Sequence, residues 1–550
     1  MLVGPLLLLL VYYKTMFPGL TNADAMDYAQ LGRNLSSGRG FVTSILRPLA
    51  LTHGNNPLAQ PDITHGPLYP LLLALAFGVM HVKDTTVSIV SGVFYLLTIP
   101  VIYFLGARVF DRAVGLLAAL VFTVNALMLE YAASGLPITL FVFLTTLLLL
   151  AVFNIAAAQK NNPKRVPRGQ YILAGLLVGL LYLTDPIFIW IAPIVVAALV
   201  MLTPERKVPA LVALLVPMGV MMLPWMVRNA ALTGNPIFGL RGMEIWMNTK
   251  GYYPGYLAYR QSPSEIVPSA GVFKGIVQKI LLGVGQIIQA FPQVTASWIL
   301  AFFLPGLLFR FSDSAVNALR RILLLCLLGL AVGSLAFVVQ MPLFVAIIPA
   351  MLVFSVAYLI HLTQQAKLRT GSLVLVTTLV TVAISFPLVG DMVLRDKQPA
   401  LKELNTARSM NKMLLRNEAA FSDQPWIVAW YADRPAIWIP ADDRKIGSVR
   451  RQFAKARWLF LTDKTRTLSP EWGEMYNLLA RWNDVYIKEA AKGKTLNSIR
   501  IAGKEPPLLQ ALDGFVTVPP TKDGAPSVVI AAVPEEIGRA SWRERVYVYV

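Results

Sequence analysis

The residues best suited to chemistry lie in one polar segment, 22–41, that directly follows the first hydrophobic run. Asp24 and Asp27 stand three positions apart in it, which places both carboxylates on one face of a helix. A charged side chain in or beside hydrocarbon costs on the order of 2 to 3 kcal/mol or more, so acids here point to function. Either can act as a general base or position a substrate hydroxyl. The alternative is that both acids cap an interfacial helix.

Groups able to bind an anion occur in other segments that we expect on the same side of a membrane. They are His65, Arg47, Arg228 and Asn229. Arginine suits a phosphate because its planar fork donates two parallel hydrogen bonds. The alternatives are a solvated surface imidazole for His65 and helix-end anchors for the two arginines.

The sequence contains no metal-binding motif. Its four histidines, His53, His65, His81 and His361, lie far apart and show no HxH or HExxH spacing. Asp24 and Asp27 lack a third oxygen ligand with which to hold Mg²⁺. We therefore expect chemistry that needs neither a metal nor another cofactor.

Membrane helices must position these residues. Of the 550 residues 56% are hydrophobic and 14% charged, and the mean hydropathy is +0.59, which predicts a polytopic membrane protein. The net charge of +19 comes from Lys and Arg that punctuate the apolar runs. This pattern reports topology and gives no reason to expect a nucleic-acid partner. The single cysteine, Cys326, excludes a disulfide framework within the chain.

Apolar runs of about 17 to 25 residues predict membrane-spanning helices, because lipid offers the backbone no other hydrogen-bond partners. About eleven such runs are present. They are approximately 1–17, 86–107, 113–132, 138–159, 170–184, 187–203, 208–227, 294–310, 320–339, 342–363 and 371–390.

Lys and Arg gather in alternate short loops, which the positive-inside rule assigns to the cytoplasm. The loops that carry Asp24, Asp185 and Arg228 then lie outside, together with the tail after Asp391. This alternation requires the apolar stretch 66–81 to be a re-entrant or interfacial helix.

Three external segments are long: 18–85, 228–293 and everything from 391 onward. In the first of these segments, residues 24–36 are predicted to form a short helix. Charged residues rise in the third, where strand-like 425–431 and 456–461 alternate with helical 398–418 and 470–489. We therefore expect a transmembrane domain over 1–391 and a small extracytoplasmic α/β domain over 392–536. Trp426, Trp430 and Trp438 are candidate core residues, or contacts of a binding surface. Residues 537–550 resemble the translation of a sequencing adapter and are left out of the predicted fold.

Three motifs, in order along the chain, carry a resemblance to a known family. They are Asp24-Ala-Met-Asp-Tyr-Ala-Gln-Leu-Gly-Arg-Asn-Leu-Ser-Ser-Gly-Arg-Gly-Phe41, Thr64-His-Gly-Pro-Leu-Tyr-Pro-Leu-Leu72 and Pro224-Trp-Met-Val-Arg-Asn-Ala-Ala-Leu-Thr-Gly-Asn-Pro236. The sequence resembles the GT-C glycosyltransferases of the protein-mannosyltransferase and aminoarabinose-transferase type over most of 1–391. This implies transfer of a sugar, from a polyprenyl-phosphate donor, to a hydroxyl or phosphate of a protein, glycan or lipid. It also implies a multi-pass protein of the plasma (inner) membrane with its active site outside.

The resemblance assigns roles to several residues. Asp24 matches the catalytic acid of the family, and Asp27 is the second candidate for the base. His65 occupies the place of a Lys or His in relatives, and Tyr69 follows in the same motif as a substrate-binding candidate.

The sequence departs from the family pattern at several positions. Gly66 replaces a proline, Ile138 stands where relatives carry a second acid, and 340–342 lacks the expected cation. Asp185 replaces an arginine, and is either a substrate contact or, as we favour, a helix cap.

Two other classes of function remain open on the sequence alone. A lipid or sugar-lipid transporter would also place charges at membrane depth, but is expected to show internal repeats. A non-catalytic membrane scaffold would use its soluble domain for binding.

Overall fold

The computed structural model describes most of the chain and divides it into two compact units. Outside the described residues lie 1, 54–55, 57–58, 163–165, 250–254, 268–270, 296, 340–343, 367–382, 384, 387, 389, 391, 394–402, 443–444, 447–448, 450–452, 454–455, 471, 475, 478–514, 519–527 and 533–550. The first unit, here the membrane unit, comprises Met1–Leu20, Ile63–Ile245 and Gly271–Gln398. The second, here the sheet unit, comprises Thr21–Asp62, Trp246–Ala270 and Pro399–Val550.

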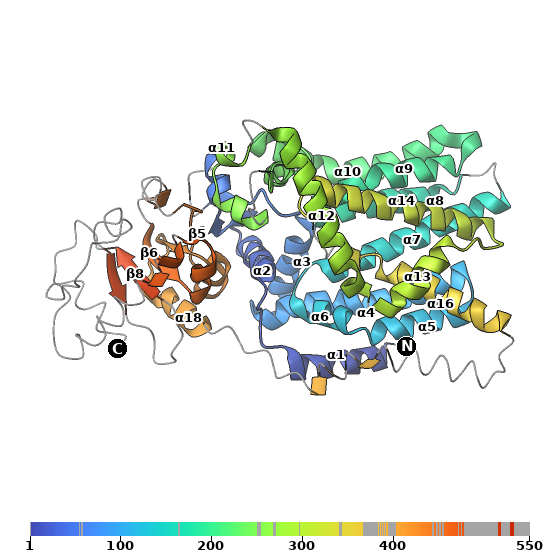
Figure 1. Ribbon diagram of the computed structural model, residues 1–550, viewed down its shortest axis with the longest axis horizontal. Coiled ribbons are helices and arrows are strands. Elements are labelled where there is room, and N and C mark those ends of the chain that lie inside the picture. The colour runs from blue at the N-terminus through green and yellow to red at the C-terminus, as the bar shows by residue number, and fades with distance from the viewer. Residues whose placement is uncertain are drawn as a thin grey trace. The chain divides into compact units, whose positions relative to one another are not determined.

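The membrane unit is helical (Figure 1). Its helices are α1 (Val3–Met16), α3 (Leu68–Val79), α4 (Asp84–Val109), α5 (Arg112–Thr123), α6 (Ala126–Ser134), α7 (Ile138–Asn161), α8 (Arg168–Thr184), η2 (Pro186–Trp190), α9 (Ala192–Met201), η3 (Pro204–Arg206), α10 (Lys207–Thr233), η4 (Gly239–Ile245), α12 (Val272–Thr295), α13 (Ser297–Leu308), α14 (Ser314–Ala336) and α16 (Ile348–Gln365).

Several of these helices have the length and apolar composition of membrane spans. Among the described residues five qualify: α4, α7, α10, α14 and α16. A sixth span is possible if α5 and α6, which meet at 59°, cross as one broken helix. The polytopic membrane fold is thus confirmed, whereas the count of eleven spans stays a prediction. Most of the predicted span 371–390 falls outside the described residues.

The short stretch 66–81 contains one short helix, and its re-entrant or interfacial position stays a prediction. It forms α3, a helix of 12 residues, which at 1.5 Å per residue is too short to cross the hydrocarbon core. The basic loops also meet one another. Lys160 in the last turn of α7 bonds Asp313 before α14 at 2.9 Å, and Phe110 between α4 and α5 packs edge-on against Phe311. These contacts place three predicted cytoplasmic loops at one end of the unit.

The sequence did not predict α12, a helix of 24 residues that begins in the external segment 228–293 and ends two residues beyond it. Lys274, Gln278 and Lys279 interrupt its apolar residues, so no continuous hydrophobic run marks it. Its polar positions alternate with exposed apolar ones such as Phe273, Leu281 and Ile288. This is the pattern of an amphipathic helix.

The sheet unit mixes helices and strands. Its elements are α2 (Ala23–Ser36), β1 (Val42–Thr43), β2 (Ile45–Leu46), η1 (Pro48–His53), β3 (Gln60–Pro61), η5 (Gly255–Arg260), α11 (Pro263–Ile266), α18 (Leu404–Met413), β4 (Ala419–Ser422), α19 (Pro425–Ile427), η6 (Val428–Ala432), β5 (Ala436–Trp438), β6 (Ala456–Leu461), η8 (Asp463–Thr467), β7 (Phe515–Val518) and β8 (Val528–Ala532).

Six strands form one sheet in the order β2-β5-β4-β6-β8-β7. The first four are parallel, and β8 and β7 are antiparallel to their neighbours. Strand β2 belongs to the first external segment, and its Ile45 pairs with Ala436 of β5. The predicted boundary at residue 391 did not anticipate that this segment completes the edge of the sheet.

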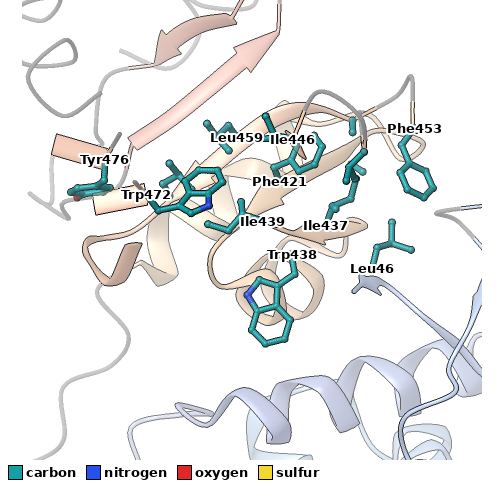
Figure 2. Close-up of a cluster of buried hydrophobic side chains, with 14 residues drawn as sticks. Leu46, Phe421, Ile437, Trp438, Ile439, Ile446, Phe453, Leu459, Trp472 and Tyr476 are labelled. Carbon is teal, nitrogen blue, oxygen red and sulfur yellow. The ribbon is translucent and has the colours of Figure 1, made fainter. Parts of the chain in front are cut away.

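The core of the sheet unit is built from side chains of these strands and their connections (Figure 2). Phe421, Ile437 and Leu459 are fully buried there, and Leu46 of β2 joins them. Trp438 is buried and meets Trp426 edge-on, with ring centroids 5.5 Å apart. Core packing is therefore the role of these tryptophans, as the sequence favoured.

One predicted strand is wrong. Residues 425–431 form α19 and then the single π-helical turn η6. Pro425 fixes the first helical position, and apolar residues on all sides of the turn imitate the pattern of a buried strand. The strand predicted at 456–461 is confirmed as β6. The helix predicted at 398–418 is shorter, Leu404–Met413, and most of 470–489 lies outside the described residues.

A buried carboxylate lies where two parallel strands end. Asp423 follows β4 and accepts hydrogen bonds from the backbone N–H and the hydroxyl of Thr462, at 3.1 and 2.6 Å. Burial raises the pKa of Asp423 to about 6, although the bonds from Thr462 act in the opposite direction. Arg260 is the nearby cation and donates to the carbonyls of Ile439 and Pro440.

This pKa predicts a pH-dependent stability. Asp423 binds its proton more tightly in the folded than in the unfolded protein, whose aspartate pKa is about 3.9. The Asp423 contribution to the free energy of unfolding is therefore full below pH 4, and falls by about 3 kcal/mol as pH rises from 4 through 6. Thermal unfolding of wild type and Asp423→Asn from pH 4 to 8 measures the difference. A difference that does not change with pH would contradict the assignment.

Candidate active site

Helix α2 carries both candidate acids and begins with a side-chain cap. Asn22 accepts hydrogen bonds from the backbone N–H groups of Asp24 and Ala25, at 2.8 and 3.3 Å. Asn22 thus satisfies the first N–H groups, the role that a capping Asp would otherwise have. The helix predicted over 24–36 is confirmed within one residue.

The two acids occupy different environments. Asp24 is exposed in the first turn of α2. Asp27 is 4% exposed, and forms an ion pair with Arg47. Gln30 donates to the other oxygen of Asp27 at 2.9 Å. Asp24 is therefore the carboxylate that solvent or a substrate can reach, whereas Asp27 is held on both oxygens.

Two carboxylates lie close to the guanidinium of Arg47. It is 7% exposed, and Asp62 lies 3.9 Å from its guanidinium, opposite Asp27. Burial disfavours the cation, but Asp27 and Asp62 outweigh this effect and raise the pKa of Arg47. The contacts favour a structural role for Arg47, while its predicted binding of phosphate stays a prediction.

Arg33 attaches α2 to the connection between β4 and β5. Its guanidinium donates to the carbonyls of Trp430 and Ala429 at 2.8 and 2.7 Å, and pairs with Asp433 at 2.9 Å. Burial lowers the pKa of Arg33 to about 10, with Asp433 acting against the shift. Asp433 takes up a left-handed backbone, φ +49°, where η6 ends. Residues 429–433 of the C-terminal part of the chain thus bind helix α2, which carries the two candidate acids.

The remaining candidates belong to the membrane unit, and the turn 64–67 carries the first of them. His65 is half-buried, and Gly66 packs directly on the end of α8. A Cβ on Gly66 would lie 2.8 Å from the carbonyl oxygen of Thr184 and closer still to that of Leu183. Glycine in place of the family proline therefore permits a close backbone contact beside His65.

Asp185 follows Thr184 and belongs to an ionic network centred on Arg241. It caps η2 by accepting from the N–H of Ile187 at 3.0 Å, which confirms the predicted cap. Arg241 of η4 donates to Asp185 at 2.6 Å and to Glu244 at 3.0 Å. Lys279 of α12 adds a second cation by donating to the carbonyls of Glu244, Ile245 and Ala336. Sequence reasoning missed these partners, although the spacing of Arg241 and Glu244 suits an ion pair.

The end of α10 holds the other two phosphate candidates. The guanidinium of Arg228 lies 4.5 Å from the centre of the Trp225 ring. Asn229 is 3% exposed and lies beside Tyr182, whose hydroxyl donates to the carbonyl of Ile237 at 2.7 Å. Arg228 is only partly buried, which leaves it the more accessible of the two.

Tyr69 is fully buried in α3. Its hydroxyl lies 2.8 Å from that of Ser91 and donates to the carbonyl of Gly135 at 2.9 Å. These contacts favour a packing role for Tyr69, while its predicted contact with substrate stays a prediction. Among the described residues no three His, Cys, Asp or Glu side chains converge as metal ligands would.

Comparison with known proteins identifies the fold. Residues 64–227 match the family described as dolichyl-phosphate-mannose-protein mannosyltransferase. The structure is similar to that of ArnT from Cupriavidus metallidurans bound to undecaprenyl phosphate, with 13% identity and a TM-score of 0.54 over 97% of this chain and 98% of that chain. No curated protein matches the sequence.

The chain has the GT-C glycosyltransferase fold. The oligosaccharyltransferase of Archaeoglobus fulgidus also shares this fold, with 14% identity and a TM-score of 0.56 over 86% of this chain and 69% of that chain. The archaeal oligosaccharyltransferase AglB from Archaeoglobus fulgidus, in complex with an inhibitory peptide and a dolichol-phosphate, matches with 13% identity and a TM-score of 0.55 over 84% of this chain and 70% of that chain. The GT-C fold suggested by the sequence is thus confirmed.

We expect substitution of Asp24 and substitution of Asp27, both in α2, to change the thermal stability by different amounts. Asp27→Asn leaves the buried Arg47 with only the more distant Asp62, and loss of one partner from a buried ion pair costs about 3 kcal/mol or more. Asp24→Asn changes an exposed group, so we expect little change in stability. Thermal unfolding of the detergent-solubilised chain measures both. Equal melting temperatures for the two variants would contradict the assignment of Asp27 as the structural acid.

Proposed function

We propose that the protein transfers a sugar from a polyprenyl-phosphate donor to an acceptor hydroxyl or phosphate on the outer face of the membrane. The match of residues 64–227 to the mannosyltransferase family supports this most strongly. The GT-C fold agrees, and one protein that shares it was solved with undecaprenyl phosphate. The proposed acceptor is a protein, a glycan or a lipid.

The proposed reaction is a direct displacement assisted by a base. The acceptor oxygen attacks the anomeric carbon, and the bond from that carbon to the phosphate oxygen breaks. The bonding pair leaves with the polyprenyl phosphate, while the acceptor proton passes to a carboxylate. Alignment of attacking and leaving groups supplies much of the rate enhancement.

Asp24 is the base in this proposal. It is the exposed acid of α2, and it follows the first apolar helix by eight residues. Asp27 is less suited, because Arg47 and Gln30 already occupy its oxygens. Asp27 instead holds α2 in place.

His65, Arg228 and Asn229 are the proposed ligands of the donor phosphate. Cationic and amide donors stabilise the charge that develops on a departing phosphate. With three such groups we expect no metal requirement, so EDTA should leave the transfer rate unchanged.

Replacement of Asp24 tests the role of the base. We expect Asp24→Asn to lower kcat by about 100-fold or more, because proton transfer typically contributes 10²- to 10⁴-fold. The assay uses purified protein in lipid nanodiscs with a panel of polyprenyl-phosphate sugars, and mass spectrometry of the products. Gln424→Ala, a buried change in the β4 connection, serves as the control. Undiminished transfer by Asp24→Asn would refute the assignment.

Orientation in the membrane provides an independent test. We propose the plasma (inner) membrane as the location, with 22–41 outside. After Cys326→Ser, we expect Ser37→Cys to react with an impermeant maleimide in intact cells. Glu205→Cys should react only after permeabilisation; both positions are exposed. Labelling of Ser37→Cys only after permeabilisation would contradict the proposed outer site and its chemistry.

A further inference from the structure

A buried glutamine connects the acidic helix to the sheet. Gln30 is 0% exposed and lies one helical turn beyond Asp27 on α2. Its Nε2 donates to Asp27 at 2.9 Å and to the hydroxyl of Thr43 at 3.1 Å. Its Oε1 accepts from the N–H of Ser44 at 2.9 Å and from Asn34 at 3.1 Å. Every hydrogen-bonding position of the Gln30 amide is therefore occupied.

These bonds continue into the six-stranded sheet. The carbonyl of Ser44 accepts from the N–H of Ala436, where β2 pairs with β5. Asn34 also donates to the carbonyl of Val42 at 2.8 Å. The polar ladder, which we define as Asp27, Gln30 and Asn34, thus fastens one face of α2 to segment 42–44, and through Ser44 to β5.

The polar ladder restricts the movement of α2 in a way that burial of apolar side chains does not. Ten consecutive residues of α2, Ala25–Asn34, are buried, and the apolar ones among them pack the helix into the unit. Packing of apolar side chains tolerates small sliding and rotation, whereas four directional hydrogen bonds on one amide fix both. The exposed Asp24 lies on the same helix, less than two turns from Gln30. A rotation of α2 would therefore move its carboxylate.

We propose that Gln30 is a positioning residue for sugar transfer, and that through it the C-terminal sheet sets the orientation of the Asp24 carboxylate. This inference rests on the proposed function. It gives the C-terminal domain a catalytic purpose without requiring it to touch a substrate. Gln30 acts through Asp27 and the backbone of α2, and not on the reacting atoms.

The first test compares two buried glutamines of the same unit. Gln30→Ala removes the ladder amide. Gln424→Ala removes an amide that is 2% exposed and bonds Thr462 and Lys464, remote in sequence from α2. Misplacement of a catalytic group by about 1 Å can cost 100-fold in rate, so we expect Gln30→Ala to lower kcat 10- to 100-fold with KM within twofold of wild type. Gln424→Ala should keep the wild-type kcat.

A conservative variant separates positioning from stability. Gln30→Glu keeps an acceptor for Ser44 and Asn34, but its ionised carboxylate cannot donate to Asp27. When protonated, the introduced carboxyl regains that donor. We therefore expect the kcat of Gln30→Glu, relative to wild type, to rise as pH is lowered from 8 towards 5, whereas the ratio for Gln30→Ala stays constant.

The outcomes distinguish the two proposals. If Asp24→Asn abolishes transfer while Gln30→Ala retains the wild-type kcat, the positioning role is refuted and the function stands. Equal losses of kcat in Gln30→Ala and Gln424→Ala would also refute it, because general destabilisation would then explain both. If Asp24→Asn retains full transfer, the assignment of Asp24 as the base is refuted. The positioning role of Gln30, which depends on that assignment, is then refuted as well.

Discussion

The buried ion pair between Asp27 and Arg47 is the interaction on which the sheet unit depends. Two charges removed from water are tolerated only when they are paired and hydrogen-bonded. Asp62 and Gln30 complete this environment, so the pair joins α2, the segment after β2 and the segment after β3. Because the pair fixes one carboxylate of α2, the other, Asp24, is left exposed at the start of a helix that cannot easily turn.

The membrane unit also contains charged side chains that are removed from water, and a second network pairs them. Arg241 pairs with both Asp185 and Glu244, and Lys279, which is held by three backbone carbonyls, supplies a second positive charge. Charges near hydrocarbon are costly, and mutual pairing lowers that cost. The turn that carries His65 packs on the residues next to Asp185. The network therefore also shapes the surroundings of a proposed phosphate ligand.

Sequence patterns predicted the elements that are determined by residues close together in the chain. Apolar runs gave most of the helices, and the polar segment after α1 gave α2 and its acids. The pattern could not show that Ile45–Leu46 pairs with a strand almost 400 residues away, because such pairing has no local signature. Likewise the apolar run 425–431 favoured a strand, and tertiary packing made it helical.

The candidate site was predictable in composition but not in detail. Asp24 and Asp27 look equivalent in sequence, and only burial against Arg47 separates them. Gln30 carries no charge and stood out from the rest of its motif in no way, so its four bonds could be found only in three dimensions. Arg47 looked like a phosphate ligand because its carboxylate partners lie 20 and 15 positions away in sequence.

The most direct test is a cryo-electron microscopy structure of the full chain in lipid nanodiscs with a polyprenyl phosphate bound. The account predicts phosphate oxygens within hydrogen-bond distance of His65 and Arg228. It also predicts that the Asp24 carboxylate faces the open side of that phosphate, while Arg47 remains paired with Asp27. A phosphate bound by Arg47, with Asp27 released towards the lipid head group, would contradict it.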